Sequence, residues 1–256
     1  IHSGIRTVFK SIAVRLAQGS QTIKDPRQAN PVGFRGRPRL TDAPCPTGCT
    51  ACSQACPAAA IVHEPLRIDL GRCMQCGDCV PACPAGVLEI SGDFRLAAAA
   101  RADLVLSRSR PQLEPLRVSQ ALHKRFGRSL KMRSVSAGGC NGCELEINAL
   151  TNVNFDIGRY GIDIVPSPRH ADALVLSGPI TRNMAQALSL CWQGMPDPKF
   201  VIAVGACAIS GSPFEGSDAL DRDFLERFKP ALHVPGCPPH PLTFVCGILD
   251  LLGIDS

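Results

Sequence analysis

The sequence predicts two domains of different classes on one chain: an α+β domain followed by an α/β domain. Three observations predict this. A duplicated four-cysteine motif occupies residues 45–84, short apolar stretches alternate with helical ones from residue 130 onward, and four further cysteines stand where those apolar stretches end. The chain has 256 residues, 45% of them hydrophobic and 19% charged, which is enough for two ordinary globular domains.

Charge is distributed unevenly along the chain. The net charge is +5, but residues 1–40 and residues 101–133 each carry +7, while residues 41–100 carry −3 and residues 134–256 carry −6. Two basic stretches therefore flank an acidic, cysteine-rich module. The chain has only one Trp and one Tyr, which is few for stacking on bases, so we expect no nucleic-acid partner.

The first forty residues form a basic arm, in which apolar residues recur at helical spacing among cations. This pattern predicts an amphipathic helix that docks on a membrane arm, on anionic headgroups or on another protein. No secretory signal is present and no apolar run reaches the ~18 residues that span a bilayer, so we expect a cytoplasmic chain beside any membrane involved. The apolar positions are Ile5, Val8, Phe9, Ile12 and Leu16, and the cations among them are Arg6, Lys10 and Arg15.

Two cysteine runs repeat one another about 28 residues apart, within a predicted domain at residues 41–95. Each run has four cysteines, and the last is followed by a proline. This is the sequence form of a ferredoxin-like domain with two 4Fe–4S clusters. The first run is Cys45, Cys49, Cys52 and Cys56 before Pro57, and the second is Cys73, Cys76, Cys79 and Cys83 before Pro84.

The spacing assigns the ligands of the two clusters. Three thiolates two or three residues apart wrap a turn of backbone around three corners of a cube, and the fourth ligand, before the proline, reaches only the other cluster. The first cluster is therefore assigned to Cys45, Cys49, Cys52 and Cys83. The second cluster is assigned to Cys73, Cys76, Cys79 and Cys56.

Zinc and disulfides are the alternatives for these cysteines. Four-cysteine zinc sites use two separated pairs, whereas each run here has four thiols, and the runs are too tightly patterned for a disulfide scaffold. Iron–sulfur ligation is therefore favoured. One irregularity is that three residues separate Cys45 from Cys49 where two separate Cys73 from Cys76, so Cys45 is the least constrained ligand.

The second half of the chain predicts a flavodoxin-like α/β domain at residues 131–256, joined through a basic, proline-interrupted linker at residues 96–130. Apolar strands alternating with helices are typical of a parallel sheet covered on both faces. Strands are predicted at residues 162–165, 173–176, 200–204 and 231–234, and helices at residues 181–192 and 241–252.

Four cysteines follow strands of this domain. Cys140 and Cys143 follow an apparent strand and open a helix, while Cys207 and Cys237 follow the strands that end at residues 204 and 234. Loops at the carboxyl ends of parallel strands meet at one sheet edge, so these thiols can close around a third 4Fe–4S cluster. A glycine near each ligand lets the backbone approach the sulfurs. Zinc or free thiols remain open alternatives at this point.

Two further cysteines, Cys191 and Cys246, lie inside predicted helices without glycine flanks. Buried structural thiols are the expectation for both. No glycine-rich dinucleotide fingerprint follows the first strand of the α/β domain, so the sheet gives no sign of a nucleotide pocket.

Both halves resemble known subunits. Residues 34–38 (FRGRP), the two cysteine runs and residues 68–73 (IDLGRC) resemble the two-cluster ferredoxin subunit of formate hydrogenlyase, which is related to a subunit of respiratory complex I. The second half is similar to the small subunit of membrane-bound, energy-converting [NiFe] hydrogenases. The similar segments are residues 138–146 (GGCNGCELE), 165–172 (VPSPRHAD), 204–207 (VGAC) and 234–239 (VPGCPP).

The resemblance implies three 4Fe–4S clusters on one polypeptide and a peripheral place on the cytoplasmic face of the inner membrane. It also implies three kinds of partner: a hydrogenase-type or complex I-type large subunit, membrane arm subunits, and an electron donor or acceptor subunit. By analogy Glu144 lies at the junction with the large subunit, and Arg169 and His170 contact it. Glu144 could equally complement a helix N-terminus, and His170 could be an ordinary surface or core histidine.

The resemblance implies an electron-transfer subunit of a membrane-bound [NiFe] hydrogenase of the formate-hydrogenlyase type, with no catalytic residue of its own. After twelve thiols are assigned, only Cys191 and Cys246 remain, whereas a nickel–iron centre needs four cysteines. One alternative is a complex I-like quinone oxidoreductase. Its members typically have two adjacent cysteines at this place, whereas two residues separate Cys140 from Cys143 here. A non-catalytic iron–sulfur sensor or scaffold is another.

Overall fold

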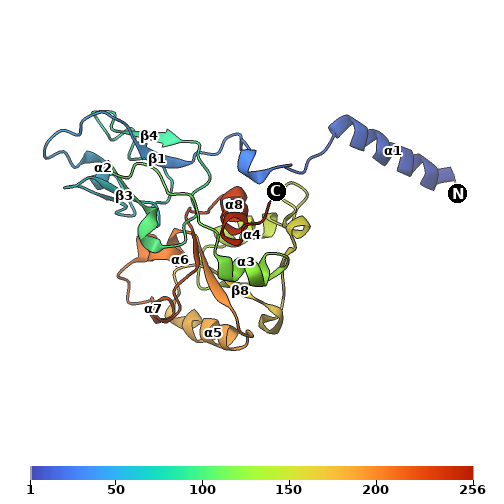
Figure 1. Cartoon of the computed structure of the whole chain (residues 1–256). Coiled ribbons are helices and arrows are strands. Elements are labelled where there is room, and N and C mark those ends of the chain that lie inside the picture. Colours follow the sequence, from blue (N-terminus) through green and yellow to red (C-terminus); the bar gives the residue numbers. More distant parts are fainter. Residues whose placement is uncertain (1, 256) are drawn as a thin grey trace.

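The computed structural model describes residues 2–255, and it describes side chains from residue 10 onward. Helix α1, His2–Gln18, extends away from the rest of the protein (Figure 1). It coincides with the predicted helix. The side chains of Ile5, Arg6, Val8 and Phe9 lie outside the described residues, whereas Ile12 and Leu16 are exposed. In the described part of the chain, no helix is long and apolar enough to cross a membrane.

The N-terminal domain consists of two small antiparallel sheets that hold the cysteine runs in the loops between strands. One sheet pairs β1 with β4, and the other has the order β2-β3-β5. The first cysteine run lies between β1 and β2, and the second between β3 and β4. The elements are β1 (Arg37–Leu40), α2 (Ala51–Gln54), β2 (Ile61–Val62), β3 (Arg67–Asp69), β4 (Leu88–Ser91) and β5 (Val105–Ser107).

Residues 96–130, predicted as a linker, are part of both domains. Strand β5 completes the β2-β3-β5 sheet, which places residues 105–107 inside the N-terminal domain. Ala98 exchanges two backbone hydrogen bonds with His233, at 3.0 and 2.8 Å, and so extends the edge of the other domain. The two remaining elements of this stretch are η2 (Arg101–Leu104) and α3 (Gln120–Phe126). Charge and proline content alone did not reveal these pairings.

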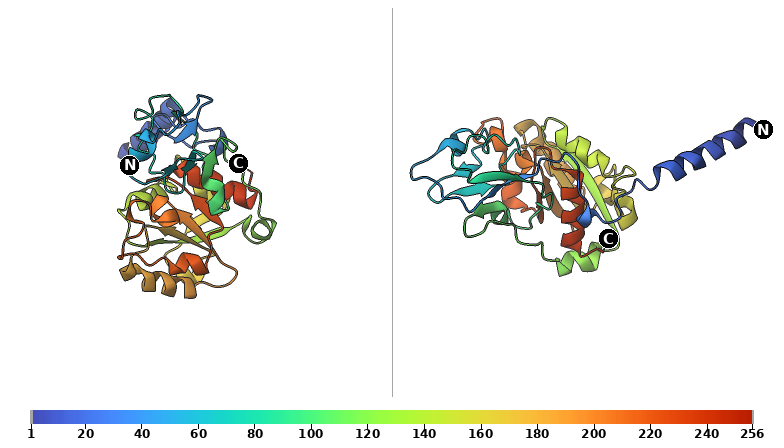
Figure 2. Two further views of the ribbon diagram at one scale, coloured as in Figure 1. Left: turned by 90° about the vertical axis from the view of Figure 1, so that its left-hand side faces the viewer. Right: turned by 90° about the horizontal axis from the view of Figure 1, so that it is seen from above.

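The segment that follows α1 crosses the C-terminal domain before it enters β1. Its short helix η1, Pro26–Gln28, lies against α8, Pro241–Leu252. The Arg27 guanidinium donates to Asp250 Oδ1 at 2.7 Å and to the carbonyl oxygen of Ile254 at 2.9 Å. Residues 20–40 are therefore anchored to the body of the protein, and only α1 projects from it (Figure 2).

The C-terminal domain contains a five-stranded parallel sheet of order β10-β9-β8-β6-β7. Counted from the first strand of this domain, the order is 2-1-3-4-5, which is the flavodoxin-like order. The predicted strands are confirmed to within one residue at each end. These four are β7 (Ile162–Ile164), β8 (Ala173–Ser177), β9 (Phe200–Val204) and β10 (Leu232–Val234). The fifth, β6 (Leu130–Ser136), is the strand expected before Cys140, for which no bounds were predicted.

Helices cover both faces of this sheet because alternate residues of each strand point to opposite sides. Leu174 and Leu176 of β8 pack toward Leu188, whereas Val175 packs toward Phe244. The predicted helices at residues 181–192 and 241–252 are therefore found on opposite faces. The remaining elements are α4 (Gly142–Ala149), η3 (Ile157–Tyr160), η4 (Pro168–His170), α5 (Arg182–Gln193), α6 (Ala206–Ser210), η5 (Ser212–Phe214) and α7 (Asp223–Arg227).

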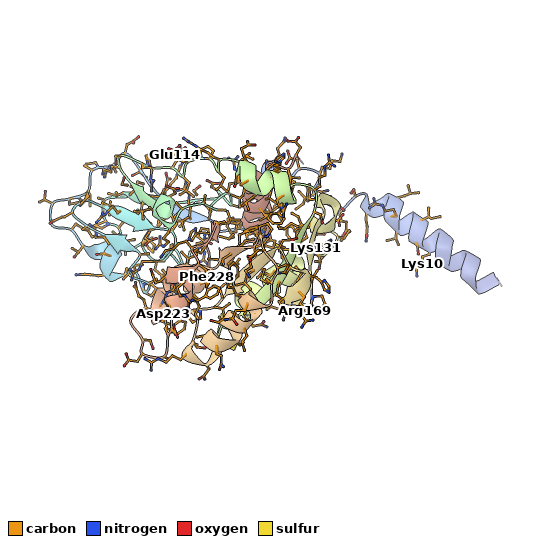
Figure 3. All side chains as sticks on the ribbon, turned by 60° about the horizontal axis from the view of Figure 1, so that its bottom comes forward. Lys10, Glu114, Lys131, Arg169, Asp223 and Phe228 are labelled. Carbon is orange, nitrogen blue, oxygen red and sulfur yellow. The ribbon has the colours of Figure 1, made fainter. Side chains whose placement is uncertain are left out.

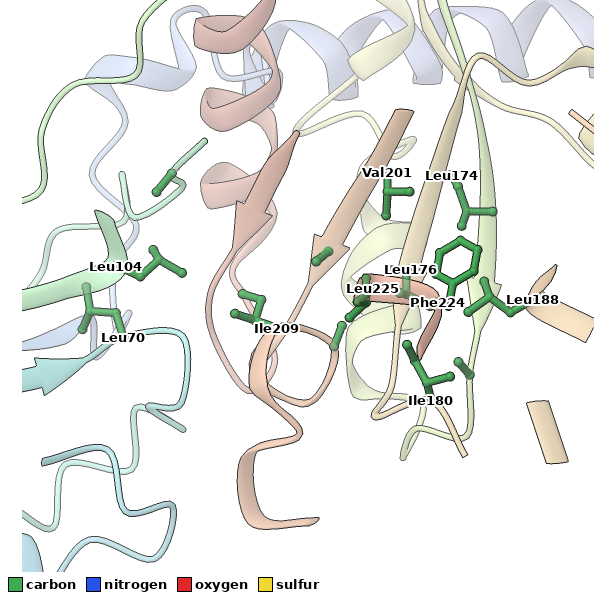
Figure 4. Close-up of a cluster of buried hydrophobic side chains, with 14 of the residues drawn as sticks. Leu70, Leu104, Leu174, Leu176, Ile180, Leu188, Val201, Ile209, Phe224 and Leu225 are labelled. Atoms are coloured by element: carbon green, nitrogen blue, oxygen red, sulfur yellow. The ribbon is translucent and has the colours of Figure 1, made fainter. Parts of the chain in front are cut away.

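One hydrophobic core continues from the N-terminal domain into the C-terminal domain (Figure 4). Leu70 and Leu104 of the first domain are buried in it, as is Ile209 of α6 in the second. A side-chain carbon on Gly71 would lie 2.8 Å from Ile209, so the two domains touch closely here. This shared core fixes the position of the cysteine runs relative to the sheet.

Candidate iron–sulfur sites

The structure brings the cysteines together in the three sets predicted from the sequence. The first set, called site 1, is Cys45, Cys49, Cys52 and Cys83. Burial raises the pKa of the Cys52 thiol, and the nearby thiols of Cys83, Cys45 and Cys49 raise it further. Cys45, whose spacing constrains it least, therefore lies close enough to Cys52 to raise the pKa of that thiol. Ligation of a cluster by these four thiols remains a prediction.

Site 2 is Cys56, Cys73, Cys76 and Cys79. Burial raises the pKa of Cys73 to about 12 and that of Cys79 to about 11, and the other thiols of the set contribute in the same direction. The four thiols line one small pocket whose other walls include apolar side chains such as Ile61 and Ile68. The prediction that Cys56 and Cys83 cross over to the other run's site fits this arrangement.

Backbone amides point at several of these sulfurs. The N–H groups of Ala60 and Val87 donate to the Sγ atoms of Cys56 and Cys83, each at 3.3 Å, and the Gln75 N–H donates to Cys73 Sγ at 3.4 Å. Such hydrogen bonds favour the thiolate over the thiol. They are the contacts that a cluster-binding loop needs, because they offset the negative charge of the sulfurs.

Site 3 is Cys140, Cys143, Cys207 and Cys237. Cys140 and Cys237 lie in the loops after β6 and β10, Cys143 lies in the first turn of α4, and Cys207 lies in α6 directly after β9. Burial is the main cause that raises the pKa of Cys143 to about 12. The Glu144 carboxylate and the three other thiols of the set raise it in the same direction. Burial likewise raises the pKa of Cys207 to about 11, with Cys237 and Cys140 as its thiol neighbours. The carboxyl edge of the sheet therefore gathers these thiols, as its topology predicts.

Gly205 shows why a small residue precedes Cys207. Its φ is +88°, and a side-chain carbon placed on it would lie 2.6 Å from Cys143 Sγ. The backbone therefore passes directly against a ligand sulfur, in a conformation that L side chains rarely adopt. At this position the structure shows the close approach of backbone to sulfur that the glycines near the third set of thiols were predicted to allow.

The donor sets, four thiols each, fit 4Fe–4S clusters. Four crowded thiols with raised pKa values are stable as thiolates only beside positive charge, which iron supplies. Zinc would hold four sulfurs about 3.8 Å from one another, given Zn–S bonds of about 2.3 Å. A 4Fe–4S cluster instead binds its four thiolates at four separate corners of the cube.

Glu144 lies beside site 3 in the first turn of α4. Its Oε1 accepts a hydrogen bond from the Ser177 hydroxyl at 2.6 Å. Burial raises the pKa of Glu144, but hydrogen bonds from Ser136, Ser177 and its own backbone outweigh burial and lower the pKa below its usual value. The carboxylate is thus held ionised next to the cluster site, which agrees with either predicted role.

Arg169 and His170 lie elsewhere. Both are exposed in η4, which precedes β8, whereas Glu144 contacts Ser177 at the end of β8. β8 alone separates the two ends of the sheet by about 13 Å. Figure 3 shows Arg169 in the same region as Lys131, which belongs to the start of β6. The structure does not bring them to Glu144, and their contact with a large subunit remains a prediction.

Arg222 is a residue of site 3 that the sequence did not reveal. Its guanidinium donates to the carbonyl oxygens of Cys207, Ala208 and Ile209, at 2.8–3.2 Å, and to that of Pro179 at 3.2 Å. It thereby ties α6 and its ligand to the loop after β8. Burial lowers the pKa of Arg222. A lone arginine fifteen residues after a cysteine carries no motif by which it could have been found.

The three sites follow one another through the molecule. Cys52 of site 1 acts electrostatically on Cys79 of site 2, so these two sites are neighbours. Arg72, which precedes Cys73 of site 2, accepts a hydrogen bond at its carbonyl oxygen from Ser212, in the helical turn after α6. Site 2 thus lies between site 1 and site 3.

Cys191 and Cys246 belong to none of the three sets. Cys246 is 1% exposed in α8, and burial raises its pKa to about 12, which is the environment of an inert structural thiol. Cys191 is half-buried in α5 against the core on the other face of the sheet.

Fold and thiol sets together define a two-domain iron–sulfur protein, and comparison with known proteins agrees. The family model of the 4Fe-4S dicluster domain matches residues 37–89. The family model of the 20 Kd subunit of NADH ubiquinone oxidoreductase matches residues 140–251. The chain belongs to this second family, with a 4Fe–4S dicluster domain in front of it.

Two curated relatives are subunits of hydrogenase complexes by name. The chain is 42% identical over 134 residues to the probable membrane-bound hydrogenase subunit mbhJ of Pyrococcus furiosus, which covers 52% of this chain and 79% of that protein. It is 41% identical over 134 residues to formate hydrogenlyase subunit 7 of Escherichia coli, which covers 52% of each. The chain thus spans about half the length of the latter. These relatives confirm the predicted resemblance.

One solved structure, that of the membrane-bound sulfane sulfur reductase (MBS), an archaeal respiratory membrane complex, contains a chain 26% identical to this one. The match covers 52% of this chain and 73% of that chain, with a TM-score of 0.44.

Proposed function

We propose that this chain is the electron-transfer subunit of a membrane-bound [NiFe] hydrogenase complex of the formate-hydrogenlyase type. It binds three 4Fe–4S clusters, at sites 1, 2 and 3, and each cluster supplies one-electron transfer when bound. Electrons pass between a donor or acceptor subunit at the site 1 end and a catalytic large subunit at the site 3 end. The relatives named as hydrogenase subunits support this proposal.

The observation that carries the proposal is the serial order of the three thiol sets in two domains that share a hydrophobic core. Sites 1 and 2 share the N-terminal domain, and the shared core around Leu70, Leu104 and Ile209 holds site 2 against the segment that bears site 3. A sensor or a scaffold has no need of three sites in sequence. Electron transfer does, because each step needs a short, fixed separation.

The chain's own residues prepare each site for a cluster. Backbone N–H groups of Ala60, Gln75 and Val87 stabilise the bound thiolates, and Arg222 fixes the loop of Cys207. Glu144 keeps a negative charge beside site 3, where the large subunit is proposed to dock. The two cysteines left over lie in different helices, so the catalytic centre belongs to the partner, and this chain supplies no catalytic residue.

The complex is proposed to sit peripherally on the cytoplasmic face of the inner membrane, beside its membrane arm subunits. Helix α1 supports this placement. Ile12 and Leu16 are 49% and 79% exposed beside the cations Lys10 and Arg15, a surface suited to a membrane arm or to anionic headgroups.

The second candidate is a complex I-like quinone oxidoreductase, since the matching family model is that of its 20 Kd subunit. The two residues between Cys140 and Cys143 favour the hydrogenase. The discriminating test is purification of the chain with its partners without oxygen. A nickel-containing large subunit with two C-x-x-C pairs, and reduction of the clusters by hydrogen, are expected. A large subunit without nickel would favour the quinone oxidoreductase.

Metal content tests the cluster count in the same preparation. Three clusters require about twelve iron atoms per chain and no stoichiometric zinc. A count of about eight would remove the third cluster from the proposal. A protein that carries its clusters but has no stable large-subunit partner and is not reduced by hydrogen would favour the non-catalytic iron–sulfur sensor. A colourless protein without a paramagnetic signal on reduction would overturn the iron–sulfur proposal itself.

A further inference from the structure

Sites 1 and 2 are built on one repeated frame. The Ala60 N–H donates to Cys56 Sγ, and 27 residues further along the Val87 N–H donates to Cys83 Sγ, both at 3.3 Å. The internal repeat is therefore present in the hydrogen bonds as well as in the sequence. Each residue around site 1 accordingly has a counterpart around site 2 with which it can be compared.

The frame differs between the two sites at His63. Its Nε2 atom lies 3.5 Å from Cys52 Sγ, eleven residues earlier in the chain. The counterpart of Cys52 is Cys79, and the residue eleven positions after Cys79 is Ile90. Ile90 has no hydrogen to donate. Site 1 therefore has an imidazole against a ligand sulfur, whereas the equivalent sequence position at site 2 is occupied by a hydrocarbon side chain.

Chemistry fixes the direction of the hydrogen bond. A cysteine bound to iron is a thiolate, so Cys52 Sγ has no proton and accepts only. The contact therefore requires the hydrogen on Nε2 of His63. A hydrogen bond to a cluster sulfur stabilises the reduced form, which carries one more negative charge, more than the oxidised form, and so raises the reduction potential.

We propose that His63 is a positioning residue that raises the reduction potential of site 1 above the value that its backbone hydrogen bonds alone would give. This rests on the proposed function, because it needs a cluster at site 1. His63 is half-buried and lines an open cavity of about 630 Å³ together with Cys45, Cys49 and Arg67. Site 1 lies at the far end of the series from site 3. The hydrogen bond from His63 therefore acts at this outer end, next to the surface that a donor subunit can reach.

The test compares the reduction potentials of three forms of the full chain in its complex: wild type, His63→Leu and His63→Gln. Leucine removes the donor, whereas the glutamine amide retains an N–H near the sulfur. In His63→Leu, the midpoint potential of site 1 is expected to fall. At a fixed potential, the oxidised-to-reduced ratio of site 1 should therefore rise about three- to tenfold, where a tenfold change corresponds to about 59 mV for one electron. His63→Gln is expected to shift less than half as far.

Paramagnetic resonance supplies the assignment and a second readout. The signal that moves in His63→Leu should be the one that also changes in Cys49→Ser, which identifies it as site 1. In deuterated water, pulsed measurements should show a coupled deuteron from position 63, in addition to that of the Val87 N–H, in wild type and in His63→Gln, whereas only the Val87 deuteron should remain in His63→Leu.

An unmoved site 1 midpoint in His63→Leu would overturn the inference. So would equal shifts in the leucine and glutamine variants, or a common shift of all three sites. Iron analysis of the same samples separates this result from failure of the proposed function. Wild-type protein with fewer than about eight iron atoms per chain would remove the ferredoxin-type pair itself, whereas full iron with an unmoved midpoint removes only the role of His63.

Discussion

The hydroxyl of Ser212 donates a hydrogen bond to the carbonyl oxygen of Arg72 at 3.1 Å, across the junction of the two domains. Arg72 directly precedes Cys73 of site 2, and Ser212 follows the short helix that bears Cys207 of site 3. The Arg72 guanidinium also pairs with Glu215. A polar link therefore joins the backbones of two sites that must exchange electrons.

Replacing Ser212 with alanine tests that link. The serine is 3% exposed, so its loss leaves a carbonyl without its partner and is expected to cost about 1 kcal/mol at the junction. Glu215→Gln removes only a partly exposed ion pair and is expected to cost less. Hydrogen–deuterium exchange of residues 206–214 in the loaded protein should rise about fivefold in Ser212→Ala. A larger effect of Glu215→Gln would contradict the assigned role.

Gly205→Ala is expected to abolish site 3 selectively. The new methyl group would meet Cys143 Sγ at 2.6 Å, at a φ of +88° that alanine disfavours. Iron should fall from about twelve to about eight atoms per chain, while the signals of sites 1 and 2 persist.

Gly216→Ala is the matched control for this substitution. Gly216 has a similar φ of +79°, but a side-chain carbon there would have nothing within 4 Å. It should therefore cost about 1 kcal/mol of backbone strain and no iron. Equal iron loss in both variants would show that strain, and not the contact with Cys143, governs the site.

The thiol sets could be predicted from the sequence because local spacing controls them. Runs such as Cys73, Cys76 and Cys79 wrap one turn of backbone, and the proline after Cys56 marks the ligand that crosses over. Site 3 could be predicted because the carboxyl ends of parallel strands meet at one edge of the sheet. Cys140, Cys207 and Cys237 follow three such strands, so they lie at the same edge.

Other features depend on contacts between distant residues and left no local pattern. Strand β5 was hidden in a basic, proline-interrupted stretch, because its pairing with β3 is decided by the partner strand and not by its own composition. Arg222 reaches four carbonyl groups only after α6 and α7 have packed. The analogy that grouped Arg169 with Glu144 carried no distance information, and the sheet places them at opposite ends.

Arg222→Met is expected to destabilise the loop of Cys207. The long apolar side chain keeps the volume, but the carbonyl groups of Pro179, Ala208 and Ile209 lose the guanidinium donor, and that of Cys207 keeps only the Gly211 N–H. Unsatisfied carbonyls cost about 1–3 kcal/mol each where water does not reach them, so a total loss of about 3 kcal/mol is expected. The reduction potential of site 3 should also fall, because a positive charge near Cys207 is removed.

Redox titration and the rate of cluster loss on warming measure both effects of Arg222→Met. Arg227→Met is the control, since Arg227 is an exposed arginine in the last turn of α7, five residues further along. It should leave the potential of site 3 and the lifetime of the cluster unchanged. A variant at position 222 that behaves like this control would refute the positioning role of Arg222.

The stability of helix α8 is expected to depend on pH through His240, its N-cap. Nδ1 of His240 accepts the Leu242 N–H at 3.1 Å, and the ring packs edge-on against Phe34 and Phe155. Burial lowers the pKa of His240 below its usual value. The folded state therefore binds this proton less readily than the unfolded state, so stability is fully present above the unfolded pKa, about 6.5, and is lost as pH falls below it.

Hydrogen–deuterium exchange at the first turn of α8, corrected for the intrinsic rate, measures this dependence. Between pH 8 and pH 5.5 the protection of this turn should fall in the wild type, by at most about 1.4 kcal/mol per pH unit. His240→Asn retains an N-cap acceptor and has no proton to bind, so its protection should be nearly constant over the same range. At pH 8, where the wild-type histidine is neutral, the two proteins should differ little. Parallel pH profiles would show that another group is responsible.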